Sequence, residues 1–243
     1  MIPIVIHYCW FGRGPLSDLA KKCIASWRKF MPEYEIREWN EDNFDVHLLP
    51  YTTEAYESRR YAFVSDYARF WVLYRYGGVY FDTDVELIRP MEDVLQEGPF
   101  MGFEILSGER MAVNPGLGMA AEPGMGLYKA ILDRYENLSF LTEKGNLNPY
   151  TMIPLVTDLL KEEGLRGDGA VEQVAGITIY PPDWFNPFDD ATGRLRKTEN
   201  THAIHWYAKS WLPAERAWKT VLKRTFRRLF GTKWLTRLRR LFK

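Results

Sequence analysis

A helix-like segment, a glycine pair, a short strand and two carboxylates follow one another without a break, and this succession constrains the fold most strongly. In chain order they are residues 58–76, Gly77 and Gly78, Val79–Phe81, and Asp82 and Asp84. Glycine ends a helix in the left-handed conformation at little steric cost. Because alternate residues of an extended strand point to the same side, Asp82 and Asp84 can converge on one point while Thr83 faces away.

Two hard oxygen ligands beside open solvent suit a Mg²⁺ or Mn²⁺ ion that also holds phosphate oxygens. For the Asp82–Asp84 triplet alone, an exposed acidic turn is at least as good an explanation. The apolar residues on both sides favour a metal site, because carboxylates at the end of a core strand need a cation. Asp66 and Arg69 share a helix face and either form a local ion pair or face the same cleft, where the guanidinium fork suits phosphate.

The rest of the chain alternates between strand-like and helix-like segments, which predicts an α/β domain with a largely parallel sheet. Strands are expected at residues 2–8, 34–39, 79–81, 100–105, 177–180 and 201–206, and helices at 17–31, 58–76, 127–135 and 153–163. An aromatic-rich loop is expected at 181–187. Ligands of such sheets collect beyond the carboxyl ends of the strands, where Asp82 and Asp84 would lie.

Composition favours a folded body of enzyme size, since 46% of the 243 residues are hydrophobic. Cys9 and Cys23 are the two cysteines, too few for a disulfide framework or a zinc cluster, which fits a reducing compartment. The apolar start of the chain lacks a basic region and is interpreted as a core strand, not a signal peptide.

The charge is strongly asymmetric along the chain. Residues 216–243 hold eleven Lys or Arg and no Asp or Glu, which leaves 21 basic against 32 acidic residues elsewhere, a formal charge of −11. Trp, Leu and Phe recur at helical spacing among these basic residues, as in helices that lie on anionic membranes. We therefore expect a body at 1–213 and a membrane-surface tail at 214–243. A solvated or oligomer-packing helix pair and non-specific nucleic-acid binding are the alternatives.

Three ordered motifs resemble glycosyltransferase family 32, the DXD-containing sugar transferases, and most of all its bacterial capsular and surface-polysaccharide subgroup. They are Ile6-His7-Tyr8-Cys9-Trp10-Phe11-Gly12, Ser65-Asp66-Tyr67-Ala68-Arg69 and Tyr76-Gly77-Gly78-Val79-Tyr80-Phe81-Asp82-Thr83-Asp84-Val85. The resemblance covers residues 2 to about 212. It implies a GT-A (Rossmann-like) fold, a nucleotide-sugar donor, most simply a UDP-sugar, a divalent metal, Mn²⁺ or Mg²⁺, and retention of anomeric configuration.

The resemblance also implies roles for individual residues. Trp10 would stack on the uracil of the donor, although without the resemblance a core or rim tryptophan is an equally good explanation. Tyr8 and Ser65 would also bind the donor. Asp66 and Arg69 would bind the transferred sugar, with Arg69 near the diphosphate. Asp84 would bind the metal directly, while Asp82 would hold the ribose or sugar and reach the metal mainly through water.

A fourth motif, Ile204-His205-Trp206 with Ser210 and Trp211, resembles the closing segment of the same family. His205 would bind the metal or phosphate, although a lone histidine is more often structural, as we expect for His7 and His202. Ser210 and Trp211 would hold the diphosphate. Glu104 and Asn114 are weaker candidates for the acceptor side. The 180–185 loop forms either an acceptor wall or, more simply, a packed aromatic loop.

Together these features predict a metal-dependent sugar transferase that acts on a glycan or lipid-linked saccharide at the cytoplasmic face of the plasma membrane. The rival enzyme class is a phosphotransferase of the haloacid dehalogenase type. That class needs a second acidic pair, of which Gly167-Asp168-Gly169 is only a fragment. A membrane-bound carbohydrate-binding module without catalysis is the non-enzymatic alternative.

Overall fold

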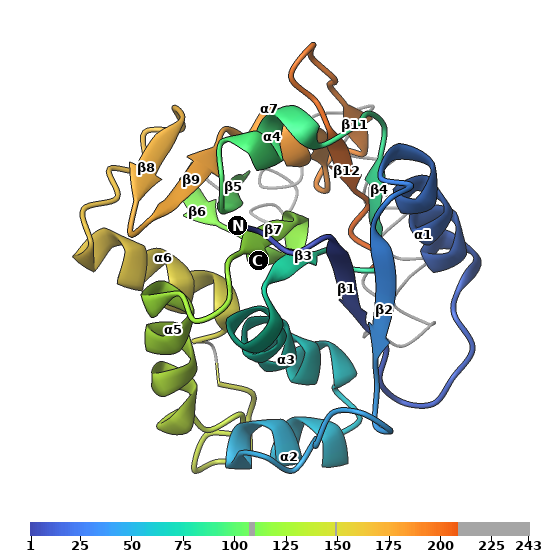
Figure 1. Cartoon of the computed structure of the whole chain (residues 1–243). Helices are drawn as coiled ribbons and strands as arrows, with labels where there is room; N and C mark the ends of the chain where they lie inside the picture. Colours follow the sequence, from blue (N-terminus) through green and yellow to red (C-terminus); the bar gives the residue numbers. More distant parts are fainter. Residues whose placement is uncertain (107–109, 149, 209–243) are drawn as a thin grey trace, which may run out of the picture.

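A mixed β-sheet forms the central layer of the computed structural model, which describes residues 1–106, 110–148 and 150–208 (Figure 1). The strands are β1 (Val5–Cys9), β2 (Glu35–Trp39), β3 (Gly78–Tyr80), β4 (Val85–Leu87), β5 (Phe100–Ile105), β6 (Met111–Val113), β7 (Met119–Ala121), β8 (Glu172–Val174), β9 (Ile177–Tyr180), β10 (Phe188–Asp189), β11 (Arg194–Leu195) and β12 (Ala203–His205). The sheet order is β2-β1-β3-β7-β5-β9-β8, and β6 pairs with β5.

Strand direction agrees with the predicted fold class. Strands β2, β1, β3, β5 and β9 run the same way, while β6, β7 and β8 run against them. The largely parallel α/β sheet is therefore confirmed. The antiparallel strands are its unpredicted part, because segments of three residues carry too little periodic signal.

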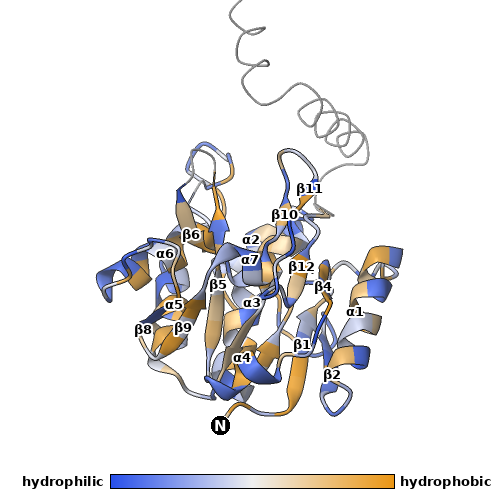
Figure 2. Ribbon diagram, turned by 90° about the horizontal axis from the view of Figure 1, so that it is seen from above, coloured by the Kyte–Doolittle hydropathy of each residue, from blue (hydrophilic) through white to orange (hydrophobic). Residues whose placement is uncertain are grey.

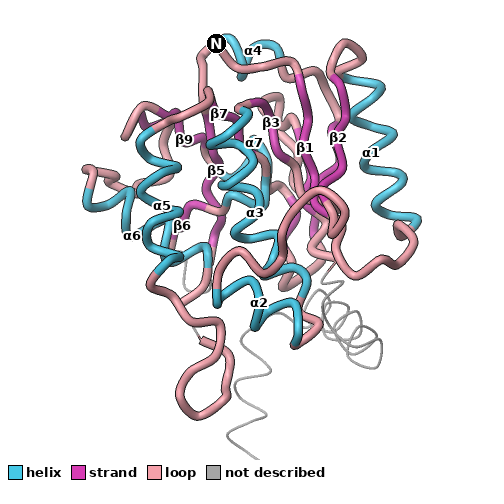
Figure 3. Tube along the Cα trace, turned by 60° about the horizontal axis from the view of Figure 1, so that its bottom comes forward, coloured by secondary structure: helices cyan, strands magenta, loops and turns pink. Residues whose placement is uncertain are grey.

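Helices cover both faces of this sheet, as Figure 3 shows for α1 on one side and α3, α5 and α6 on the other. They are α1 (Asp18–Phe30), α2 (Pro50–Glu57), α3 (Tyr61–Tyr76), α4 (Glu92–Gln96), α5 (Gly126–Glu136), α6 (Met152–Glu162) and α7 (Pro182–Phe185), with a 3₁₀ turn, η1, at Pro115–Leu117. The predicted helix at 58–76 begins at Tyr61, after the separate helix α2. The predicted loop at 181–187 contains α7.

Alternation along the central strands supplies two apolar cores, one on each face of the sheet. On β3 and the residue after it, Val79 and Phe81 pack with α1, while Tyr80 packs with α3 on the opposite face. The same alternation on β5 separates Phe100 from Met101. Figure 2 shows hydrophobic residues along β5 and on the helices around it. The two cores fix β3 from both sides, so the residues that follow it have a defined direction.

A glycine at position 78, the first residue of β3, is required by close packing. Gly78 has φ +100°, and a Cβ there would lie 2.7 Å from the Val5 carbonyl oxygen. Only glycine combines this backbone conformation with so close an approach to β1. The chain therefore passes from α3 into β3 and delivers Asp82 and Asp84 just beyond the carboxyl end of the strand.

Strand β4 follows the acidic pair and pairs with β12, which brings His205 opposite Val85. The last described strand thus returns to the carboxylates from more than a hundred residues away. Among the helices that the structure describes, none is long and apolar enough to cross a membrane. The proposed tail and the boundary at 213 lie outside the described residues.

Candidate active site

A cleft of about 750 Å³ opens beyond the carboxyl ends of β1 and β3. Its walls come from the loop after β1, the start of α3, the acidic pair, β5, the residue before η1, the start of α6, the end of β12 and the segment after it. The lining includes Trp10, Gly12, Gly14, Arg59, Tyr61, Ser65, Asp66, Arg69, Asp82, Thr83, Asp84, Glu104, Asn114, Met152, Ile153, His205, Tyr207 and Ala208. This location matches the prediction that ligands bind at this edge of the sheet.

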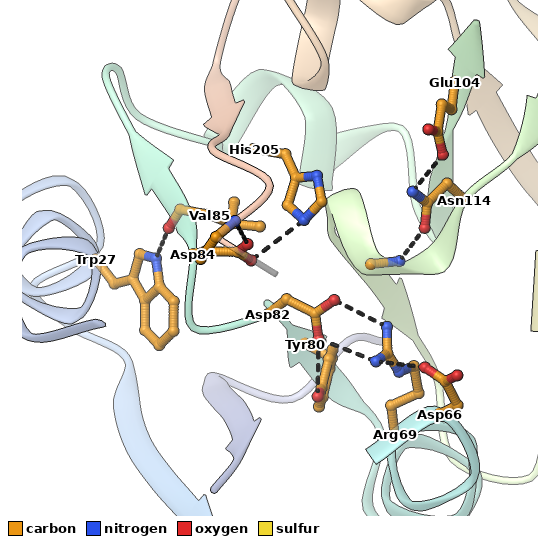
Figure 4. Close-up of polar contacts among 12 residues, drawn as sticks. Trp27, Asp66, Arg69, Tyr80, Asp82, Asp84, Val85, Glu104, Asn114 and His205 are labelled. Atoms are coloured by element: carbon orange, nitrogen blue, oxygen red, sulfur yellow. Dashed lines mark hydrogen bonds and ion pairs between the residues drawn. The ribbon is translucent and has the colours of Figure 1, made fainter. Parts of the chain in front are cut away.

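Arg69 links two carboxylates on one side of the cleft (Figure 4). Its Nη1 donates to Asp82 Oδ2 at 3.2 Å, and its Nη2 lies 3.0 Å from Asp82 Oδ1 and 3.0 Å from Asp66 Oδ1. Tyr80 supports the arrangement, because its hydroxyl donates to Asp82 Oδ1 at 3.2 Å. We call Asp66, Arg69 and Asp82 the arginine clamp. It holds a planar guanidinium in a fixed orientation at the cleft wall.

Burial governs the electrostatics of the clamp. Burial raises the pKa of Asp66 to about 7, although the Arg69 charge opposes the shift. Burial likewise raises the pKa of Asp82, again against Arg69. Burial would lower the pKa of Arg69, but Asp82 and Asp66 raise it above its ordinary value. One buried cation therefore serves two partly buried carboxyls, and the pKa of Asp66 remains well above its ordinary value.

Asp84 has different partners, which come from the end of β12 and the segment after it. Its Oδ1 lies 3.2 Å from His205 Nε2, and its Oδ2 accepts the Ala208 backbone N–H at 2.8 Å. Burial would raise the pKa of Asp84, but His205 and the Ala208 N–H hold it below its ordinary value. Burial would lower the pKa of His205, whereas Asp84 raises it. Trp27 of α1 donates to the Val85 carbonyl at 2.8 Å and so anchors the turn that carries Asp84.

Asp82, Asp84 and His205 form a possible metal site, because each offers one ligand atom and these atoms lie within 4.8 Å of one another. Two carboxylate oxygens and an imidazole nitrogen are acceptable ligands for Mn²⁺. Within the described residues, the buried Nδ1 of His205 has no hydrogen-bond partner. The fit to a metal therefore rests on the three ligand atoms themselves and not on an acceptor that orients the imidazole from its other side.

The loop after β1 forms another part of the cleft wall. Trp10 donates from Nε1 to the Gly14 carbonyl at 2.7 Å, and the Gly12 N–H donates to Glu41 Oε1 at 2.6 Å. Gly12 has φ +96°, and a Cβ there would overlap the Tyr61 ring. The loop is thus closed on itself and packed against the start of α3, with Trp10 in the cleft lining.

The structure brings most of the predicted site residues into this one cleft. Trp10, Ser65, Asp66, Arg69, Asp82, Asp84, Glu104, Asn114 and His205 all line it. It does not bring Tyr8 there, because this ring packs on Trp27 and its hydroxyl donates to Glu38 at 2.6 Å. Ser210 and Trp211 lie outside the described residues.

Two histidines expected to be structural have internal partners. His7 Nδ1 accepts from Trp39 at 3.0 Å, so its Nε2–H donates to the Gly77 carbonyl at 3.0 Å. Burial lowers the pKa of His7 to about 4, consistent with this neutral form. His202 lies 2.9 Å from Asp93 and stacks on Trp184. Trp184 also packs on Tyr180, so this segment is a packed aromatic unit outside the cleft lining.

Three contributions to the site were not foreseen. The Ala208 N–H is a backbone group and leaves no mark in the sequence. Tyr80 was predicted only as a strand residue, although its position two residues before Asp82 places both on the same side of the chain. Tyr207 has φ +50° and packs on His205 with ring centroids 4.2 Å apart. Burial and a hydrogen bond to Glu104 raise the pKa of Tyr207.

Comparisons with known proteins identify the class to which this fold and cleft correspond. Residues 17–101 match the profile of a family described as glycosyltransferase sugar-binding region containing DXD motif. The fold is that of the GT-A glycosyltransferases. The chain is similar to a PaToxG glycosyltransferase (18% identity, TM-score 0.52, 67% of this chain and 70% of that one). It is also similar to a glycosyltransferase involved in glycosylation of the major capsid of PBCV-1 (12% identity, TM-score 0.51, 89% of this chain and 99% of that one).

Among curated proteins, the chain is similar to two from Schizosaccharomyces pombe. Inositol phosphoceramide mannosyltransferase 3 is 27% identical over 101 residues, which cover 39% of this chain and 27% of the relative. Inositol phosphoceramide mannosyltransferase 1 is 25% identical over 111 residues, which cover 41% of this chain and 33% of the relative. The chain thus spans a third or less of the length of these relatives. The family match and the fold together support a glycosyltransferase.

Proposed function

We propose that this protein is a metal-dependent, retaining glycosyltransferase that moves a sugar from a nucleotide sugar, most simply a UDP-sugar, to a saccharide acceptor. One observation carries the proposal: the arginine clamp and the possible metal site share Asp82 and open into the same cleft. A nucleotide sugar has a diphosphate next to a polar sugar ring. Asp84 and His205 suit the diphosphate, which they would hold through a metal ion. Arg69, Asp66 and Asp82 lie beside them and suit the polar sugar ring.

Asp84 and His205, with Asp82 beside them, would hold the metal, which when bound supplies a positive charge next to the leaving diphosphate. Arg69 adds a fixed cation on the sugar side of the same region and stabilises the charge that develops as the nucleoside diphosphate leaves. Asp66 and Asp82 accept hydrogen bonds from sugar hydroxyls and fix the ring. The acceptor hydroxyl attacks on the face that the diphosphate leaves, and a leaving phosphate oxygen takes its proton. The catalytic gain is positioning and electrostatics.

The test is a screen of nucleotide sugars with and without Mn²⁺, read by thermal shift and by donor hydrolysis. A ligand that binds the folded state raises its stability by the binding free energy. Asp84→Asn should lower turnover about 100-fold or more, because it removes the carboxylate assigned to the metal. Asp18→Asn, an exposed carboxylate on α1, is the matched control and should keep the wild-type rate. Wild-type turnover by a folded Asp84→Asn chain would show that the site is misassigned.

The phosphotransferase alternative receives no support from the position of its second acidic fragment. The loop with Asp168 is tied to Glu172 on β8, where the backbone N–H groups of Arg166 and Gly167 donate at 2.8 and 2.9 Å. This loop does not line the cleft that the described residues form. A phosphatase assay separates the two enzyme classes. Turnover of a nucleotide sugar separates both from a binding module without catalysis.

We further propose that the acceptor is carried by a lipid and that residues 216–243 hold the protein on the cytoplasmic face of the plasma membrane, in surface-polysaccharide synthesis. The support is the concentration of eleven basic residues among apolar ones in that segment. The names of the curated relatives give inositol phosphoceramide, a lipid, as a partner of a related sequence.

A further inference from the structure

The turn at residues 114–117 lies directly against the arginine clamp. A Cβ on Gly116 would lie 2.5 Å from Asp82 Oδ2 and 3.3 Å from Arg69 Nη1. The same Cβ would lie 3.0 Å from Asn114 Oδ1. Gly116 does not need glycine for its backbone, because its φ lies outside the left-handed region. The requirement is for space alone, and the space is filled by the Asp82 carboxylate.

The turn itself is fixed to the neighbouring strand. Asn114 Oδ1 accepts the Gly116 N–H at 2.8 Å, and Asn114 Nδ2 donates to Glu104 Oε2 at 2.6 Å. The backbone N–H of Asn114 donates to the Gly102 carbonyl at 3.0 Å. Asn114 is 4% exposed, so both ends of its amide are committed inside the protein. The turn cannot withdraw from Asp82 without breaking these bonds to β5.

Asp82 is therefore held from three directions: by the Arg69 fork, by the Tyr80 hydroxyl and by the Gly116 backbone. Asp84 lacks such a wall, because its two oxygens face His205 and the Ala208 N–H. We infer that Gly116 and Asn114 are positioning residues that keep the Asp82 carboxylate in the arginine clamp, and so assign Asp82 to the sugar and leave Asp84 to the metal. This inference rests on the proposed function.

Two variants separate a positioning role from a structural one. Gly116→Ala puts a methyl group where the carboxylate lies and should displace it by a few tenths of an ångström or more. The matched control is Gly126→Ala at the start of α5, where a Cβ meets nothing within 4 Å. Asn114→Ala leaves the space at Asp82 open but frees the turn. It keeps the test available if Gly116→Ala fails to fold.

Each variant is measured with the nucleotide sugar that the screen identifies and with its nucleoside diphosphate alone. We expect Gly116→Ala to lower kcat of donor hydrolysis by about 10- to 100-fold, the loss typical of a misplaced group. Binding of the nucleotide sugar should weaken, while the Kd of the nucleoside diphosphate with Mn²⁺, by calorimetry, stays within about twofold. Asn114→Ala should also weaken binding of the nucleotide sugar more than binding of the nucleoside diphosphate, but by a smaller factor. A structural role would instead weaken both ligands together.

Three outcomes would overturn the inference. One is a folded Gly116→Ala chain with wild-type kcat. Another is a Gly116→Ala or Asn114→Ala chain that loses affinity for the nucleoside diphosphate as much as for the nucleotide sugar. A wild-type chain and a Gly126→Ala chain that turn over no nucleotide sugar would refute the proposed function itself, and the inference with it.

Discussion

Asp82 and Asp84 are two residues apart, yet their surroundings shift their pKa values in opposite directions. Burial raises the pKa of Asp82, while the partners of Asp84 outweigh burial and lower its pKa. The difference comes from residues distant in sequence: Arg69 and Gly116 for one, His205 and Ala208 for the other. A short acidic motif therefore does not define two equivalent ligands.

Asp66 gives a prediction of pH dependence at this scale. Its folded pKa of about 7 lies above the ordinary value, so the folded chain binds a proton more tightly than the unfolded chain. Its contribution to stability is present at low pH and is lost as pH rises toward the folded pKa. Between about pH 5 and pH 8, the wild type should lose on the order of 2–3 kcal/mol of unfolding free energy relative to Asp66→Asn.

The measurement is urea unfolding of both chains at several pH values. Asp18→Asn again serves as a control for loss of a surface carboxylate. Parallel pH profiles for the wild type and Asp66→Asn would mean that Asp66 ionises in the folded protein as it does in the unfolded chain.

At the scale of elements, local sequence predicted the α3–β3 passage and the acidic pair, since each signal there spans only neighbouring residues. Helical spacing, the glycine pair and the apolar strand were sufficient. The β4–β12 pairing and the turn at 114–117 were not predictable in this way, because their partners are distant in sequence. The family resemblance placed His205 near the metal, but no sequence pattern placed Gly116 against Asp82.

Gly78, the first residue of β3, gives a prediction at the element scale. Gly78→Ala adds both backbone strain and a clash with the Val5 carbonyl. Gly98→Ala is the matched control, since Gly98 has φ +104° but nothing within 4 Å of an added Cβ. Gly98→Ala should cost about 1–2 kcal/mol from strain, and Gly78→Ala about 1–3 kcal/mol more from overpacking.

Urea unfolding measures the loss of unfolding free energy in both variants. The slope of the unfolding free energy against urea concentration should be the same as in the wild type. Equal losses for the two variants would show that the chain relaxes around the added methyl group at Gly78 and that β1 and β3 are not held as closely as described.

At the scale of the whole molecule, the described body is acidic while the basic residues of 216–243 lie outside the described part. This separation predicts binding to anionic vesicles through the basic segment. The full chain should co-sediment with vesicles containing anionic lipid. A full-length variant with Arg227, Arg228, Arg239 and Arg240 replaced by Gln should do so much less, since each nearby charge contributes on the order of 1 kcal/mol.

Neutral vesicles are the control for lipid charge, and unchanged donor hydrolysis by the variant shows that its body is folded. Equal sedimentation of the two chains would exclude a charge-driven membrane role. Retention of the wild type on duplex DNA but not on vesicles would favour the nucleic-acid alternative.

The β4–β12 pair has a consequence for how the protein folds during its synthesis on the ribosome. Asp66, Arg69, Asp82 and Asp84 emerge early, but His205 and Ala208 follow more than a hundred residues later. Until then, the carboxylates have the arginine but neither the imidazole nor the backbone N–H opposite them. The nascent chain therefore lacks the partners of Asp84 until β12 has been added, and we expect sugar transfer to begin only after that step.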